Sequence, residues 1–75
     1  MKSVVIKGQL ISVDTEEGEI KVLDSANNFI TRLEIGRGTK LPIRSNWEDL
    51  TGLDVEAVVV NQKVKRVYYV PEEDE

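Results

Sequence analysis

The carboxylates of the segment DTEEGE, residues 14–19, are the first group in this sequence that could bind an ion. Closely spaced carboxylates are common ligands of Ca²⁺ and Mg²⁺. An EF-hand loop needs glycine at its sixth position, however, and Gly18 is fifth when Asp14 is counted as first. We therefore interpret the segment as a hairpin turn with solvated charges, and we predict neither a metal nor another cofactor.

Two further groups approach known catalytic or phosphate-binding patterns without matching them. Glu48 and Asp49 are adjacent carboxylates that could act as acid and base, but helix capping explains both. The segment GRGTK, residues 36–40, lacks the spacing of a phosphate-binding loop. The chain has no histidine and no cysteine, which removes the commonest general base and every Ser-His or Cys-His nucleophile. We therefore predict that the protein is not an enzyme.

The chain of 75 residues has room for one domain, which we place at residues 1–70. Residues 72–75 carry four negative charges, so the other ten acidic side chains balance the ten Lys and Arg. Pro71 ends the last predicted strand, and residues 71–75 are predicted to be an acidic, disordered tail. No apolar run approaches the ~20 residues of a membrane span, and no secretory signal is visible. We expect a cytoplasmic protein without membrane contact.

Five segments have the alternation or the β-branched composition of strands: residues 3–14, 19–24, 29–35, 54–60 and 63–70. Gly8 interrupts the first segment, and the apolar parity slips from Val4 and Ile6 before it to Ile11 and Val13 after it. Such a slip predicts a strand that bends at Gly8 from one sheet into another.

A short helix is predicted between the third and fourth strands. Ser45 and Glu48 have the S-x-x-E spacing of a capping box, and Gly52 is suited to end the helix. Trp47 and Leu50 are three residues apart, so they would share one face. A helix of about one turn needs tertiary packing to form, which makes these two side chains its packing residues.

This order of elements resembles the OB-fold, a five-stranded Greek-key barrel with a helix between its third and fourth strands. An SH3-like barrel is the alternative. The segments GQLISVDTEEGEIKVLD, GTKL and WEDLTGLDVEAVVVNQKVKRVYYV are similar in rhythm to small bacterial and archaeal β-barrel domains of unknown function. The resemblance implies a mainly β barrel whose helix covers one end. Trp47 and Leu50 would then close that end, rather than form an exposed stacking platform.

Apolar residues occur on both faces of nearly every predicted strand, whereas one face is enough to fill a small barrel. A contiguous apolar patch on the outer face commonly marks contact with another molecule. We therefore predict a non-enzymatic binding module that acts through protein contact or self-association. The proposed interface residues are Leu23, Ile30, Val58 and Val60.

Binding of single-stranded nucleic acid is the alternative function, because OB-folds commonly bind single strands with aromatic side chains in a basic groove. The candidate contacts are basic residues and one tyrosine: Arg37, Lys40, Arg44, Lys63, Lys65, Arg66 and Tyr68. The carboxylates of residues 14–19 would repel phosphate where such folds usually receive their ligand. Any binding is therefore expected to be weak and salt-dependent.

Overall fold

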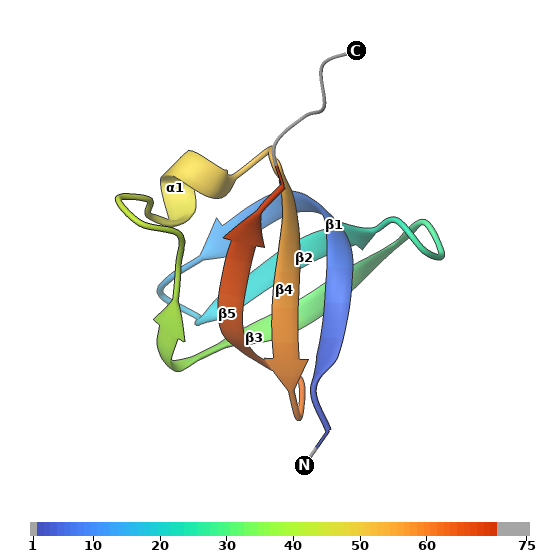
Figure 1. Cartoon of the computed structure of the whole chain (residues 1–75), viewed down its shortest axis with the longest axis horizontal. Coiled ribbons are helices and arrows are strands. Elements are labelled where there is room, and N and C mark those ends of the chain that lie inside the picture. Colours follow the sequence, from blue (N-terminus) through green and yellow to red (C-terminus); the bar gives the residue numbers. More distant parts are fainter. Residues whose placement is uncertain (1, 71–75) are drawn as a thin grey trace.

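The computed structural model describes residues 2–70, and the predicted tail at residues 71–75 lies outside them. The elements are β1 (Val4–Asp14), β2 (Glu19–Asp24), β3 (Phe29–Lys40), α1 (Trp47–Leu50), β4 (Asp54–Val60) and β5 (Lys63–Tyr69). The strands close into one barrel in the order β1-β2-β3-β5-β4, with β4 paired to β1 (Figure 1). Neighbouring strands are antiparallel except for the parallel pair β3 and β5. The predicted mainly β, OB-like barrel with one short helix is confirmed.

β1 belongs to both sides of the barrel. Residues 4–9 pair with β4 and residues 8–14 pair with β2, so the strand changes partner around Gly8. A Cβ atom at this position would overlap the backbone carbonyl of Leu23 in β2. Only glycine allows the two backbones to approach so closely. The predicted bend of the first strand is present, and a steric requirement accounts for the glycine.

The change of apolar parity in β1 lies at Ile11 and not, as predicted, at Gly8. The register between β1 and β2 shifts between Leu10 and Ser12, which leaves Ile11 as an extra residue without a partner in β2. Leu10 is fully buried, whereas Ile11 is 39% exposed. A bulge of this kind adds one residue to one strand and reverses the face of the residues that follow.

β3 continues five residues beyond its predicted end at Ile35. Gly36, the first residue beyond the predicted end, is buried, and a Cβ atom there would lie 2.8 Å from the backbone oxygen of Val64 in β5. The hydroxyl oxygen of Thr39 lies 2.7 Å from the carbonyl oxygens of both Gly36 and Val64. The glycine therefore lets β3 run alongside β5 as far as Lys40.

Ten buried hydrophobic side chains form the core: Leu10, Ile20, Val22, Leu33, Leu50, Val55, Ala57, Val59, Val64 and Val67. On β2 and β4 the buried positions alternate with more exposed ones, as expected for strands with one face toward the barrel interior. Within residues 2–70 no polar or charged side chain is buried. The interior of the barrel is thus apolar and filled.

The capping box of α1 lies one residue later in the sequence than predicted. The backbone N–H of Asp49 donates to Asn46 Oδ1 at 3.1 Å, and the backbone N–H of Asn46 donates to Asp49 Oδ2 at 3.0 Å. The capping box is therefore Asn46 with Asp49, not Ser45 with Glu48, because Asn and Asp can make the same reciprocal bonds. Gly52 has a φ of 89° just after the helix.

α1 lies beside one end of the barrel (Figure 1). Its residue Leu50 is 2% exposed and belongs to the core. Trp47 is half-buried and packs against the core from its edge. The closing role that we predicted for both residues thus falls chiefly on Leu50.

Within residues 2–70 no helix is long and apolar enough to cross a membrane.

Replacing Leu50 by alanine is expected to lower the free energy of unfolding by about 2–4 kcal/mol, because it leaves a cavity under α1. Trp47→Ala is expected to cost less, since Trp47 is only partly buried and packs against the core without belonging to it. Urea denaturation followed by circular dichroism measures both. Leu53→Ala is the matched control, because Leu53 is 38% exposed. A larger loss for Trp47→Ala than for Leu50→Ala would make the indole the principal closing residue.

Gly8→Ala is expected to cost about 3 kcal/mol or more, or to prevent folding, because the new methyl group would separate β1 from β2. Gly18→Ala is the matched control. Gly18 has a φ of 71° and open space around it, so only backbone strain of about 1 kcal/mol is expected there. Thermal denaturation of the two variants compares them directly. Similar losses at both sites would show that the β1–β2 contact tolerates a side chain.

Candidate functional site

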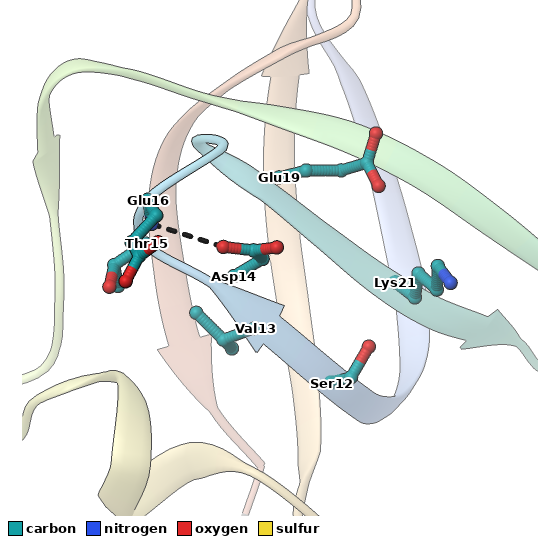
Figure 2. Close-up of a pocket in the computed structure, with 7 residues that line it drawn as sticks. All are labelled: Ser12, Val13, Asp14, Thr15, Glu16, Glu19 and Lys21. Carbon is teal, nitrogen blue, oxygen red and sulfur yellow. Dashed lines mark hydrogen bonds between the residues drawn. The ribbon is translucent and has the colours of Figure 1, made fainter.

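Several surface hollows of the barrel are lined by charged side chains, and two of them are candidates for a binding site. The first, of about 410 Å³, lies at the β1–β2 hairpin and is called the acidic hollow (Figure 2); its lining residues are Ser12, Val13, Asp14, Thr15, Glu16, Glu19 and Lys21. The second, of about 380 Å³, lies between the segment after β3 and the strand β5. This basic hollow is lined by Lys40, Leu41, Pro42, Ile43, Arg66, Val67 and Tyr68.

Asp14 shapes the turn beside the acidic hollow. Its Oδ1 accepts hydrogen bonds from the backbone N–H groups of Glu16 at 3.1 Å and Glu17 at 3.0 Å. The N–H of Gly18 donates to the carbonyl oxygen of Asp14 at 2.8 Å. An aspartate that bonds the backbone two residues on is a common turn device. The predicted hairpin turn is therefore present at residues 14–19.

The carboxylates around the acidic hollow do not converge. Glu19 Oε1 lies 3.7 Å from Arg32 Nε on the neighbouring strand β3. Figure 2 shows the side chains of Glu16 and Glu19 on opposite sides of Asp14, and Lys21 lies on the same side as Glu19. Within residues 2–70 no three Asp, Glu, His or Cys side chains form a group that could hold a metal ion. The acidic hollow is a charged surface without a preformed ligand set.

The basic hollow is built where β3 and β5 run parallel. Lys40, the last residue of β3, is the register partner of Arg66 in β5. Both side chains are exposed, and in the described part of the chain neither forms an ion pair. Like charges placed opposite each other on neighbouring strands destabilise a sheet by a few tenths of a kcal/mol to about 1 kcal/mol. The arrangement leaves two positive charges side by side with no protein counter-ion among residues 2–70.

Tyr68 orients the side chain of Arg66. The guanidinium carbon of Arg66 lies 5.7 Å from the centroid of the Tyr68 ring. Arg66 Nη1 also donates a hydrogen bond to Tyr68 Oη at 3.3 Å. A cation over an aromatic face at an exposed site gains about 0.5–1 kcal/mol. The guanidinium is therefore held at the hollow, and its remaining N–H groups are available to a ligand.

A bulge in β5 turns Arg66 outward. The register between β4 and β5 shifts so that Val58 faces Arg66 while Val59 faces Val64, which leaves Lys65 as the extra residue. Val64 and Val67 are both buried, and the two cations between them are exposed. Simple alternation would have sent one of these two side chains toward the core. The bulge therefore decides which β5 residues line the basic hollow.

A tight turn places Ile43 at the rim of the basic hollow. The backbone N–H of Ser45 donates to the carbonyl oxygen of Pro42 at 3.1 Å, and Arg44 has a φ of 64°. Positive φ at the third position of a turn is the type II pattern, in which glycine is usual. Ile43 occupies the corner of this turn and is 90% exposed.

The basic and aromatic residues predicted from the sequence line more than one hollow. Lys40, Arg66 and Tyr68 come together at the basic hollow. Lys63 and Lys65 line another hollow, next to Val60 and Asn61, and Lys65 directly precedes Arg66 in β5. Arg37 is exposed on β3, and Arg44 follows directly after the lining residue Ile43. The structure thus brings three of the seven predicted residues together in the basic hollow.

The four apolar residues predicted as an interface are also divided. Ile30 is 58% exposed, whereas the remaining three, Leu23, Val58 and Val60, are half-buried. Leu23 pairs with Gln9 of β1, and Val58 pairs with Val5 of the same strand. These two β1 positions are four residues apart, which corresponds to roughly 13 Å along a strand. Leu23 and Val58 are therefore not neighbours on the outer surface.

The segment Leu41–Pro42–Ile43 was not identified as functional from the sequence. It lies in a region with no strand or helix period, where proline and glycine suggested only a connection. An isolated isoleucine between a proline and an arginine was the one available signal, because a large apolar side chain at a turn corner cannot reach the core. The structure shows that this segment forms one wall of the basic hollow.

No protein-family model and no curated protein matches the sequence. Among solved structures, the chain is similar to CusF with bound Ag(I), at 19% identity and a TM-score of 0.72, covering 93% of this chain and 100% of that one. A second Ag(I) structure of CusF, from Escherichia coli, gives 19% identity and a TM-score of 0.69 over 93% of this chain and 94% of that one. A tryptophan-to-alanine variant of the Escherichia coli protein with Cu(II) gives 19% identity and 0.67 over 92% of each.

These neighbours support the small barrel fold, and they contradict the function predicted from the sequence. All three are structures of CusF with a bound metal ion, which points to metal binding and not to protein contact, self-association or single-stranded nucleic acid as the role found on this fold. The prediction relied on outward apolar and basic residues of a barrel. Such residues, and the fold itself, do not determine what a barrel binds.

Proposed function

We propose that this barrel is a non-enzymatic binding protein for a small anion, which it holds in the basic hollow. The observation that carries this proposal is the Lys40–Arg66 pair. The two cations are register partners on adjacent parallel strands, and within residues 2–70 they have no ion pair. An anion bound between them would relieve their mutual repulsion.

The chemistry of the two cations suits a carboxylate, phosphate or sulfate group. A guanidinium offers N–H donors in a fixed planar arrangement that matches such anions, and an ammonium adds a point charge. Each charge pair at about 4 Å contributes about 1 kcal/mol in bulk water and about 4 kcal/mol near a protein surface. Because both cations are exposed, desolvation is small and an affinity near ~1 mM, or about −4 kcal/mol, is expected.

The lining of the basic hollow supports binding without catalysis. Its ionisable side chains are Lys40, Arg66 and Tyr68, and neither a carboxylate nor a histidine is among its lining residues. General acid–base catalysis needs a proton acceptor within hydrogen-bond reach of the ligand. The residues present can attract and orient an anion, but none is placed as a base.

The metal ions of the fold neighbours do not find matching ligands in this chain. Soft and borderline ions of the copper group are bound by thiolate, thioether and imidazole groups. The sequence has no cysteine and no histidine, and its one methionine is Met1, which lies outside the described residues. Asp14 and Glu19 at the acidic hollow would suit only a hard cation, and Glu19 already pairs with Arg32. We therefore assign an anion, not a metal cation, as the ligand.

The anion proposal is tested by titrating isotope-labelled protein with inorganic phosphate at constant ionic strength, followed by two-dimensional NMR. Saturable shifts are expected at residues 40–43 and 66–68, with a Kd near ~1 mM. Lys40→Gln and Arg66→Gln should each weaken binding about tenfold, which corresponds to ~1.4 kcal/mol. Lys63→Gln is the matched control, because Lys63 is exposed on β5 but lies outside the basic hollow.

Stability gives an independent measure of the same site. Lys40→Gln should raise the free energy of unfolding by a few tenths of a kcal/mol in the absence of anion, since it removes the cross-strand repulsion. Unchanged affinity in both the Lys40 and the Arg66 variant would refute the proposal.

A metal titration tests the assignment against the fold neighbours. Addition of Ag(I) or Ca²⁺ is expected to give no saturable binding at sub-millimolar concentration, because soft donors are lacking and the carboxylates do not converge. Native mass spectrometry for Ag(I) and calorimetry for Ca²⁺ make the measurement. Stoichiometric retention of Ag(I) would show that this chain binds the ion found in its structural neighbours, and it would overturn the anion assignment. Asp14→Asn is the control for any Ca²⁺ signal at the acidic hollow.

A further inference from the structure

We infer that the anion is amphiphilic: a carboxylate or phosphate head group lies between Lys40 and Arg66, and an attached apolar body lies against the segment Leu41–Pro42–Ile43. This inference rests on the proposed anion site and names the class of molecule that fits it. The ligand is a free small molecule, and its two parts correspond to the two kinds of residue that line the basic hollow.

The lining of the basic hollow combines charged and apolar residues. Lys40 and Arg66 are register partners, and Leu41, Pro42 and Ile43 follow Lys40 directly in sequence. An inorganic ion would use only the charged part. A ligand with an attached hydrocarbon would use both, because water is displaced from the apolar wall as the head group binds.

Ile43 is the most exposed of the large hydrophobic side chains that the structure describes, at 90%. It lines the basic hollow together with Leu41 and Pro42, in the same hollow as the exposed cations Lys40 and Arg66, and it takes no part in the core. Contact with a bound hydrocarbon would remove this side chain from water. Each methylene group that is buried contributes about a fourfold gain in affinity when burial is complete.

The turn that carries Ile43 is restrained before any ligand binds. Pro42 has a fixed φ, and the bond from Ser45 to the Pro42 carbonyl closes the turn at 3.1 Å. Arg44 adopts a φ of 64°, a conformation that favours glycine. An apolar wall held in place costs less ordering on binding than a mobile loop would.

The size of the basic hollow limits the ligand. At roughly 30 Å³ for each water-sized group, about a dozen non-hydrogen atoms fit into 380 Å³. This number accommodates a head group with a short alkyl chain or a single aromatic ring. Long-chain fatty acids and dinucleotides would extend beyond the hollow.

The experiment compares two sets of anions, each with one head group and a varied apolar body. Isotope-labelled protein is titrated at constant ionic strength with the carboxylates acetate, butyrate, hexanoate and benzoate, and separately with inorganic phosphate and phenyl phosphate. Affinity is expected to rise two- to fourfold for each added methylene group up to hexanoate, because the hollow is open and burial is partial. The NMR shifts at residues 41–43 should grow along the series, while those at residues 66–68 appear with every anion.

Variants separate this inference from the proposed function. Ile43→Ser should abolish the dependence of affinity on chain length, so that hexanoate binds this variant no more tightly than acetate does. Ile30→Ser is the matched control, because Ile30 is an exposed isoleucine at 58% on another part of the barrel. Arg66→Gln should weaken binding of every anion about tenfold.

The possible outcomes distinguish the two failures. If no anion shifts the residues of the basic hollow, the proposed function itself is wrong. If phosphate binds there but hexanoate binds no more tightly than acetate, only the amphiphilic inference is overturned. A further titration with vesicles that contain anionic phosphatidylglycerol tests whether the bound head group belongs to a lipid surface. Binding to vesicles with no saturable binding of soluble hexanoate would replace the free ligand by a lipid surface and contradict the inference.

Discussion

The close approach of β1 and β2 at Gly8 is the constraint on which the rest of the structure depends. β1 pairs with β4 through its first part and with β2 through its second, so it joins two sides of the barrel. A side chain at Gly8 would overlap the Leu23 carbonyl and open this junction. The ordered segment after α1 is attached to the same strand, because Leu10 exchanges backbone hydrogen bonds with Gly52 and Leu53 at 2.7 and 3.0 Å. The closed core and the helix that covers it therefore depend on one strand.

The candidate site depends on a second backbone contact, between β3 and β5. Gly36 and Thr39 hold the end of β3 against Val64, which carries Lys40 to its place opposite Arg66. The bulge at Lys65 then turns Arg66 outward, and Tyr68 orients its guanidinium. Each of these features is a deviation from regular alternation. The basic hollow is thus a product of the irregular parts of the barrel, whereas its core is a product of the regular parts.

The similarity to CusF separates fold from chemistry. A barrel with a TM-score of 0.72 to the present chain carries Ag(I), yet this chain has no cysteine or histidine with which to hold such an ion. The side chains on the surface of a barrel can change without disturbing its apolar interior, because core and surface positions alternate along each strand. The charged hollows of this protein lie on its outer surface. The proposed ligand therefore follows from their residues and not from the strand order.

Local sequence features determined much of this structure. The alternation of apolar residues predicted β2 and β4 with their observed bounds, and the composition of residues 14–19 predicted a turn. Both signals depend only on residues that are near in sequence. Gly8 marked the bend in β1 for the same reason. The position of the capping box was wrong by one residue, because Ser45 and Asn46 are both suitable N-caps and each is followed by a carboxylate at the required spacing. The extension of β3, the bulges at Ile11 and Lys65, and the pairing of Lys40 with Arg66 were decided by the tertiary structure. They arise from contacts between strands that are distant in the chain, which no local period records.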